Sequence, residues 1–144
     1  METQNYASHR RLDPMFHIVL FLLLLLTLIG AGVNLYVSWG DHERMYSASL
    51  ILVLTVAMVI LMLLARVYPL KAQDRAIRAE ENLRHYVLTG KLLDPRLEVL
   101  QIVALRFASD GEFPALAREA AEKGLAPKDI KQAIKSWRGD FYRV

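Results

Sequence analysis

Histidine is the residue type in this chain best suited to metal binding or proton transfer, because the sequence contains no cysteine. The histidines are His9, His17, His42 and His85. No two of them have the i,i+3 or i,i+4 spacing that would bring two imidazoles to one face of a helix. The sequence therefore predicts no metal site, and the lack of cysteine excludes disulfides and thiol catalysis.

Other catalytic arrangements are also missing from the sequence. Glu80 and Glu81 are adjacent carboxylates in a charged helical stretch and are interpreted as a solvated pair. Arg106 and Asp110 are four residues apart and are expected to form a salt bridge or to cap a helix. The sequence has no glycine-rich phosphate loop and no zinc-ligand spacing. We therefore expect a protein that is not an enzyme and uses no cofactor.

A basic stripe near the C-terminus is the strongest charge pattern. A helix is predicted from Pro127 to about Arg138, with an apolar face that includes Trp137. The cations on its opposite face are Lys128, Lys131, Lys135 and Arg138. They could form a solvated face, contact anionic lipid or a partner, or contact nucleic-acid phosphates. Nucleic acid is not expected, because no arginine-rich recognition helix or aromatic platform accompanies the stripe.

Two long apolar runs predict which parts of the chain lie within a membrane and which lie outside it. Phe16–Val37 and Tyr46–Ala65 contain no charged side chain. A bilayer core about 30 Å thick needs roughly 20 apolar residues in a helix. The sequence therefore predicts a transmembrane helical hairpin over residues 16–66 with a short outer loop at 38–45, preceded by a cytoplasmic segment at 1–15.

The ends of the first run and the flanking charges predict the topology of the hairpin. Asp13 is expected to cap the first helix, with Pro14 at its first position. The run is longer than the 7–15 apolar residues of a signal peptide. Lysine and arginine favour the cytoplasmic side, and the loop has only Arg44. The cations outside the loop and near the span ends are Arg10, Arg11, Arg66, Lys71, Arg75 and Arg78. Both termini are therefore predicted to be cytoplasmic.

The first run contains small and polar residues that could pack against another helix. Thr27 and Gly30 offer little bulk, which lets helix backbones approach closely in lipid. Asn34 is expected to hydrogen-bond across the hairpin or to headgroup water, or alternatively to contact another copy or line a pore. In the second run, Thr55 is expected to bond to its own helix. Neither run has an ionisable residue in its core, which argues against a proton pump or ion-coupled carrier.

Residues 67–144 are predicted to form a helical cytoplasmic tail. Pro69 is expected to kink or end the second span, and a long juxtamembrane helix follows at Leu70–Thr89. One narrow stripe of this helix is apolar and consists of Ala72, Ala76, Ala79, Leu83 and Tyr86. This apolar stripe is suited to close packing against another helix.

Three short helices complete the predicted tail. They are expected at Arg96–Ala108, Phe113–Lys123 and from Pro127 to about Arg138. The first is apolar almost all round and includes Leu100 and Phe107, so it must be buried or form an interface. The predicted fold class is therefore all-α: a transmembrane helical hairpin, a long juxtamembrane helix and a small three-helix cytoplasmic tail.

Several short motifs resemble an uncharacterised bacterial family of small membrane proteins, a domain of unknown function. The residues that carry the resemblance are Gln4-Asn5-Tyr6, His9, Arg11, Pro14 and His17; Leu70-Lys71, Gln73-Asp74-Arg75 and Ile77-Arg78; Ala104 to Asp110 with Pro114-Ala115-Leu116; and Ile130-Lys131, Ile134-Lys135, Trp137 and Arg143-Val144. The resemblance covers nearly the whole chain and implies a bacterial inner-membrane location. It implies no activity, cofactor or partner.

The sequence supports three functional hypotheses. The first is a non-enzymatic, membrane-anchored helical module that binds a second copy or another membrane protein. The residues expected to serve helix packing or assembly are Thr27, Gly30, Asn34, Ala72, Ala76, Leu83, Leu100, Phe107 and Trp137. The second is a small homo-oligomeric channel or transporter subunit lined by Thr27, Gly30, Asn34 and Thr55. The third is a sensor of anionic lipid that acts through the basic stripe.

Overall fold

The structure, a computed structural model, describes residues 4–8 and 12–141. Within these ranges the chain is all-helical, with one isolated β-bridge and no β-strand, as predicted. It divides into two units: residues 12–68, called the hairpin, and residues 4–8 with 69–141, called the tail domain. The predictions made for His9, Arg10, Arg11, Arg143 and Val144 concern residues outside the described ranges.

The first helix of the hairpin begins where the sequence predicted. A short π-helical segment, η1 (Met15–Leu20), continues into α1 (Phe21–Val37). The Asp13 carboxylate accepts hydrogen bonds from the backbone N–H groups of Met15, at 2.9 Å, and Phe16, at 3.2 Å. The combined helix Met15–Val37 has 23 residues and contains an 18-residue stretch with a mean hydropathy of 2.6, so it is long and apolar enough to cross a membrane.

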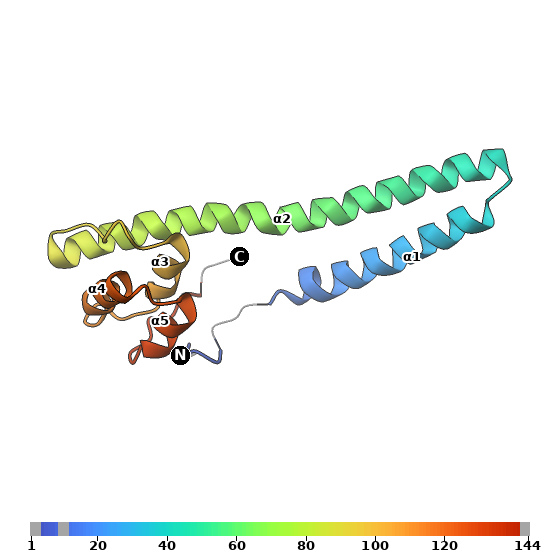
Figure 1. The fold of residues 1–144 in the computed structure, drawn as a ribbon. Helices are drawn as coiled ribbons and strands as arrows, with labels where there is room; N and C mark the ends of the chain where they lie inside the picture. Colours follow the sequence, from blue (N-terminus) through green and yellow to red (C-terminus); the bar gives the residue numbers. More distant parts are fainter. Residues whose placement is uncertain (1–3, 9–11, 142–144) are drawn as a thin grey trace. The chain divides into compact units, whose positions relative to one another are not determined.

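The connection between the two hairpin helices is shorter than the predicted loop at 38–45. The second helix, α2 (His42–Thr89), already begins at His42 (Figure 1). The Asp41 carboxylate accepts a hydrogen bond from the Arg44 backbone N–H at 3.2 Å, which caps the new helix early. Gly40 has a φ of +93°, a backbone conformation that favours glycine and lets the chain reverse direction within this short connection.

The second span does not end at Pro69. Helix α2 has 48 residues and includes Pro69, so the predicted second span and juxtamembrane helix are one continuous helix. Proline removes one backbone N–H donor, but the leucine, lysine and alanine that follow it favour helix. Helix α2 lies partly in the hairpin and partly in the tail domain. It contains an 18-residue stretch with a mean hydropathy of 2.9, which is long and apolar enough to cross a membrane.

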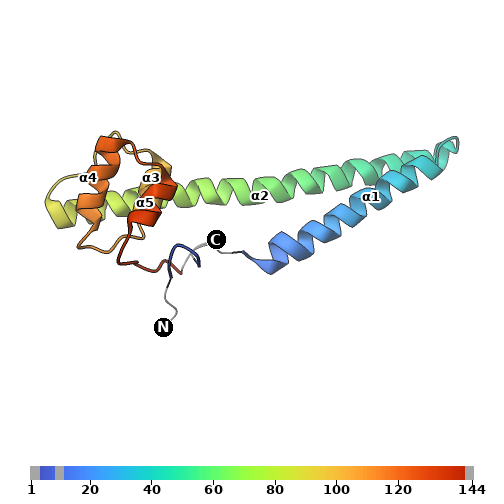
Figure 2. The same cartoon turned by 60° about the horizontal axis from the view of Figure 1, so that its bottom comes forward.

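The tail domain contains three short helices beside the C-terminal part of α2 (Figures 1 and 2). They are α3 (Val99–Leu105), α4 (Phe113–Lys123) and α5 (Pro127–Ala133). Helix α4 has the predicted bounds, with Pro114 at its start and Gly124, in the left-handed conformation, just after its end. Helices α3 and α5 are shorter than predicted.

Helix α3 begins at Val99, later than the predicted start at Arg96. The Asp94 carboxylate accepts a hydrogen bond from the Arg96 backbone N–H at 2.9 Å, which forms a turn instead of a helix cap. The helix begins after Glu98, whose backbone N–H donates to the Gln101 side chain at 2.7 Å. The Gln101 amide also donates to the Leu125 carbonyl at 2.8 Å, which links the start of α3 to the connection between α4 and α5.

Pairing between distant backbone segments explains why α3 and α5 end early. The Arg138 backbone N–H donates to the Phe107 carbonyl at 2.7 Å, and the Ser109 N–H donates to the Ser136 carbonyl at 3.0 Å. The Glu112 carboxylate accepts the Ser136 N–H at 3.0 Å. These long-range bonds replace the helical hydrogen bonds that would have extended either helix.

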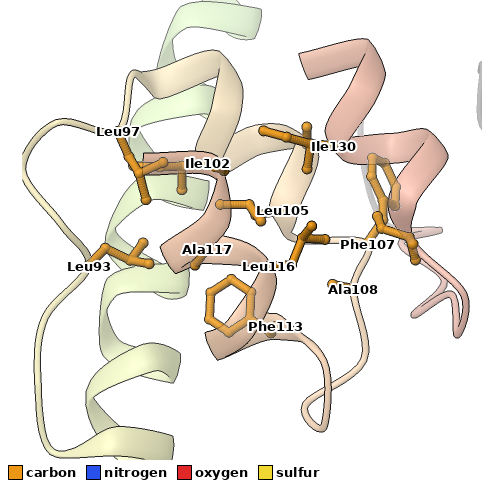
Figure 3. Close-up of a cluster of buried hydrophobic side chains, with 13 residues drawn as sticks. Leu93, Leu97, Ile102, Leu105, Phe107, Ala108, Phe113, Leu116, Ala117 and Ile130 are labelled. Carbon is orange, nitrogen blue, oxygen red and sulfur yellow. The ribbon is translucent and has the colours of Figure 1, made fainter. Parts of the chain in front are cut away.

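One hydrophobic core holds the tail domain together. Figure 3 shows its side chains, which come from α3, α4, α5 and the segments before and after α3, gathered in one cluster. The largest fully buried side chains are Phe107, Phe113, Leu105 and Ile130. The segment predicted at Arg96–Ala108 is therefore buried mainly within its own domain.

Candidate assembly surface

One face of α2 is covered by the rest of the tail domain. Ile77 and Glu81 are buried on this face. The Arg84 guanidinium lies 4.4 Å from the centroid of the Phe113 ring, and the His85 ring meets the same ring edge-on at 5.8 Å. Residues from the beginning of α4 therefore pack directly on this side of α2.

An ion-pair network around Arg84 joins the covered face of α2 to the rest of the tail domain. Arg84 bonds to Glu81 at 2.8 Å, to Asp110 at 2.7 Å from its Nε, and to the Ala108 carbonyl at 2.7 Å. The sequence missed this network, although the i,i+3 spacing of Glu81 and Arg84 was a signal for part of it.

The prediction of a salt bridge between Arg106 and Asp110 is wrong. Arg106 pairs with Asp140 at 3.1 Å, while Asp110 pairs with Arg84. Backbone pairing of the C-terminal segment with Phe107 and Ser109 accounts for the change. It brings Asp140, a residue distant in the sequence, to Arg106.

The opposite face of α2 is uncovered within the tail domain. It is the apolar stripe of Ala72, Ala76, Ala79, Leu83 and Tyr86, and all of these side chains are exposed. Leu83 is 64% exposed and Tyr86 is 53% exposed. Large apolar side chains gathered on one helix face without an intramolecular partner are typical of an interaction surface.

The buried positions of the hairpin recur every seven residues. They are Leu24 and Ala31 on α1, Ser38 directly after it, and Ala48 and Thr55 on α2. An interval of seven residues is typical of two helices packed side by side. The hairpin therefore has its own packing seam.

The small and polar residues of α1 predicted to serve packing lie outside this seam. Thr27, Gly30 and Asn34 are exposed. The Thr27 hydroxyl bonds to the Leu23 carbonyl of its own helix at 2.7 Å. Asn34 was expected by one interpretation to bond across the hairpin, but the described part of the hairpin provides no such bond to its exposed side chain. Thr55 is buried in the seam, and its hydroxyl donates to the Ile51 carbonyl of its own helix at 2.8 Å, as predicted.

The remaining assembly candidates occupy different environments. Leu100 is 57% exposed and stays a candidate contact, whereas Phe107 is only 1% exposed and belongs to the core. Trp137 is half-buried, and its ring lies 5.2 Å from that of Phe107. Phe107 therefore cannot serve as an assembly contact in the folded domain.

The predicted basic stripe does not follow one helix. Lys128 and Lys131 lie on α5, whereas Lys135 and Arg138 lie beyond its end in the segment paired with Phe107 and Ser109. Lys131 is half-buried and lies 5.9 Å from the centroid of the Phe107 ring. The helical geometry expected for a lipid-binding stripe is therefore absent over these residues.

A cavity of about 410 Å³ lies between the C-terminal end of α2 and α4. Its lining includes His85, Lys91, Asp94 and Arg118. The His85 Nδ1 bonds to the Lys91 carbonyl at 2.6 Å, and hydrogen bonds from Arg96 lower the pKa of Asp94 from 3.8 to about 2. The Lys91 carbonyl can only accept, so the His85 Nδ1 acts as the hydrogen-bond donor in this contact. The Asp94 carboxylate is bound to Arg96 and is a weak base, which makes it poorly suited to general base catalysis near neutral pH.

Within residues 4–8 and 12–141, no group of three or more histidine, aspartate or glutamate side chains could hold a metal ion. A family model described as a family of unknown function (DUF6526) matches residues 1–144. No curated protein and no solved structure matches the chain.

Proposed function

Because the chain belongs to the DUF6526 family, whose function is unknown, we propose from its structure that it is a non-enzymatic integral membrane protein acting as an anchored assembly module. The hairpin anchors the chain in a bacterial inner membrane. The tail domain uses the apolar stripe of α2 to bind a second copy or another membrane protein. The observation that carries the proposal is the exposure of Leu83 and Tyr86 opposite the covered face of the same helix.

Burial and composition support the membrane location. Only 6% of the apolar window in Met15–Val37 and 11% of that in His42–Thr89 are buried within the protein. Apolar helices with so little intramolecular cover are suited to a lipid environment, where their backbone bonds are satisfied internally. A soluble protein would instead bury most of such a helix in its core.

A contact between the two ends of the chain supports a topology with both ends on one side. The Asp140 backbone N–H donates to the Gln4 side-chain oxygen at 2.8 Å, within the tail domain. Two spans return the chain to its starting side, which is compatible with this bond. The arginine and lysine residues near the span ends support the cytoplasm as that side.

The topology can be tested by labelling single cysteines, because the chain has none. Ala7→Cys and Ser136→Cys are expected to react with a membrane-impermeant maleimide only after the inner membrane is opened. Trp39→Cys, in the connection of the hairpin, should react from the periplasmic side of intact spheroplasts. Labelling of Ala7→Cys before the membrane is opened would contradict the proposed topology.

The assembly role predicts a large effect of one charge on the apolar stripe. Leu83→Asp should remove most of the assembly, because an aspartate in a desolvated helix interface loses its hydration without gaining a partner. Native mass spectrometry of full-length protein extracted gently from its own membrane would measure the loss. The control is Gln132→Asp, which adds the same charge at an exposed position of α5 and should leave assembly unchanged.

The same spectra distinguish the kinds of assembly. A homo-oligomer, or a complex with one other membrane protein, that is lost in Leu83→Asp and retained in Gln132→Asp supports the proposal. Assembly that persists in Leu83→Asp, or a monomer in the unmodified protein, would overturn it.

A further inference from the structure

We infer that the occupant of the apolar stripe is a second copy of this chain, with the two α2 helices parallel and in register. This inference rests on the proposed function, because it names the partner of the same surface. Its basis is the spacing of the stripe together with the charges at its two edges.

The apolar stripe has the spacing of a coiled-coil seam. Its residues follow one another at intervals of four, three, four and three. In a heptad written a to g, Ala76 and Leu83 are a positions, whereas Ala72, Ala79 and Tyr86 are d positions. Such a seam is buried when a helix with the same pattern packs along it.

The edges of the stripe carry opposite charges at complementary positions. Arg75 precedes an a residue and is a g position, whereas Glu80 follows a d residue and is an e position. In a parallel pair, a g residue lies beside the e residue five positions further along the other helix. Arg75 of each copy would therefore lie beside Glu80 of the partner subunit, which forms the same ion pair twice.

Both charged residues are available for this contact. Arg75 and Glu80 are exposed, and the described part of the chain provides no ion pair to either. Their neighbour Glu81 is instead buried in the network with Arg84. Charges committed to the fold of the domain thus lie on the covered face, while Arg75 and Glu80 flank the uncovered one.

An antiparallel pair would lack this complementarity. It brings e positions of the two helices together, so a contact centred near Ala79 sets Glu80 against Glu80 of the partner subunit. Like charges at that distance oppose association. Two copies anchored with the same membrane topology also meet with their α2 helices in the same direction.

The seam is short, which restricts where the pair can form. It extends over about two heptads, fewer than the three to four that usually support an independent coiled coil. Anchoring in one membrane confines the copies and raises their effective concentration. We therefore expect the pair in the membrane-embedded full chain, and all tests use that form.

Cysteine cross-linking tests the geometry of the pair directly. Leu83→Cys places a thiol at an a position, where the two Cα atoms lie within the distance that a disulfide can bridge. Mild oxidation in native membranes should convert at least half of this variant to a covalent dimer. The control is Arg78→Cys, exposed on α2 but outside the stripe, which should give at least fivefold less dimer. Equal yields, or no dimer from Leu83→Cys, would overturn the inference.

Charge reversal tests the orientation. In the Leu83→Cys background, Arg75→Glu or Glu80→Arg alone should reduce the dimer yield at least threefold. The two changes together should restore it, because the ion pair is re-formed with reversed charges. Failure of the double change to restore the yield would overturn the parallel register.

Native mass spectrometry of the same membranes separates failure of this inference from failure of the proposed function. A complex with a different protein that depends on Leu83, without a covalent homodimer, overturns the second copy as occupant and leaves the assembly role intact. A monomer in every preparation overturns both.

Discussion

Phe107→Asp is expected to unfold the tail domain. The Phe107 side chain is only 1% exposed and packs against Trp137 with their ring centroids 5.2 Å apart. Truncating a buried phenylalanine typically costs about 3–5 kcal/mol, and an unpaired buried carboxylate adds to that cost. A domain of about 75 residues has a stability of roughly 4–11 kcal/mol at 0.05–0.15 kcal/mol per residue. The substitution therefore removes most or all of it.

Tryptophan fluorescence can measure this loss in the full chain. The protein has two tryptophans, and Trp39→Phe leaves Trp137, beside the substituted site, as the only reporter. Phe107→Asp should give the emission of unfolded protein without urea, whereas the background protein should show a cooperative urea transition. Leu100→Asp is the matched control, because Leu100 is 57% exposed and a surface change usually alters stability by within about 0.5 kcal/mol. A native urea midpoint in Phe107→Asp would contradict the core assignment.

The expected difference between Phe107→Asp and Leu100→Asp separates two residues for which the sequence predicted the same role. Leu100 and Phe107 fall in one predicted apolar helix, and both were expected to contact a partner. Hydrophobic periodicity shows that such a helix must be buried, but it does not say by which element. The structure buries Phe107 against Trp137 and leaves Leu100 outside, so only Leu100 stays a candidate contact.

Local signals predicted the elements whose ends are determined by neighbouring residues. The cap at Asp13 and the bounds of α4 at Phe113 and Lys123 follow from adjacent proline, aspartate and glycine residues. The end of α5 at Ala133 does not, because it depends on Glu112 and Phe107, which bind the backbone that follows. Such bonds join residues more than 20 positions apart, and a helical pattern carries no record of them.

Of the two faces of α2 in the tail domain, only the apolar stripe could be predicted from the sequence. The apolar stripe was evident from its spacing, and the structure confirms that Leu83 lies on an exposed helix face. The opposite face was not predictable, because Glu81 and Arg84 read as ordinary surface charges. Only the tertiary contacts with Asp110 and Phe113 make them the attachment of the tail domain to α2.

Arg84→Met should destabilise that attachment strongly. Methionine keeps much of the side-chain volume but removes the bonds to Glu81, Asp110 and the Ala108 carbonyl. The Glu81 side chain is only 7% exposed, and its nearest other cation, in Arg138, lies 3.8 Å away. Removing one partner of a buried ion pair typically costs about 3–5 kcal/mol, because the other charge stays buried without compensation.

A double substitution tests whether the unpaired buried charge of Glu81 causes the loss of stability in Arg84→Met. Arg84→Met with Glu81→Leu should recover more than half of the lost stability, since replacing both buried partners by apolar groups is often nearly neutral. Asp110→Asn should cost less than about 1 kcal/mol, because the Asp110 side chain is 68% exposed and its ion pair is partly screened. Urea transitions monitored by Trp137 in the Trp39→Phe background measure all three. A double variant as unstable as Arg84→Met alone would assign the cost to lost packing on Phe113 instead of to the buried charge of Glu81.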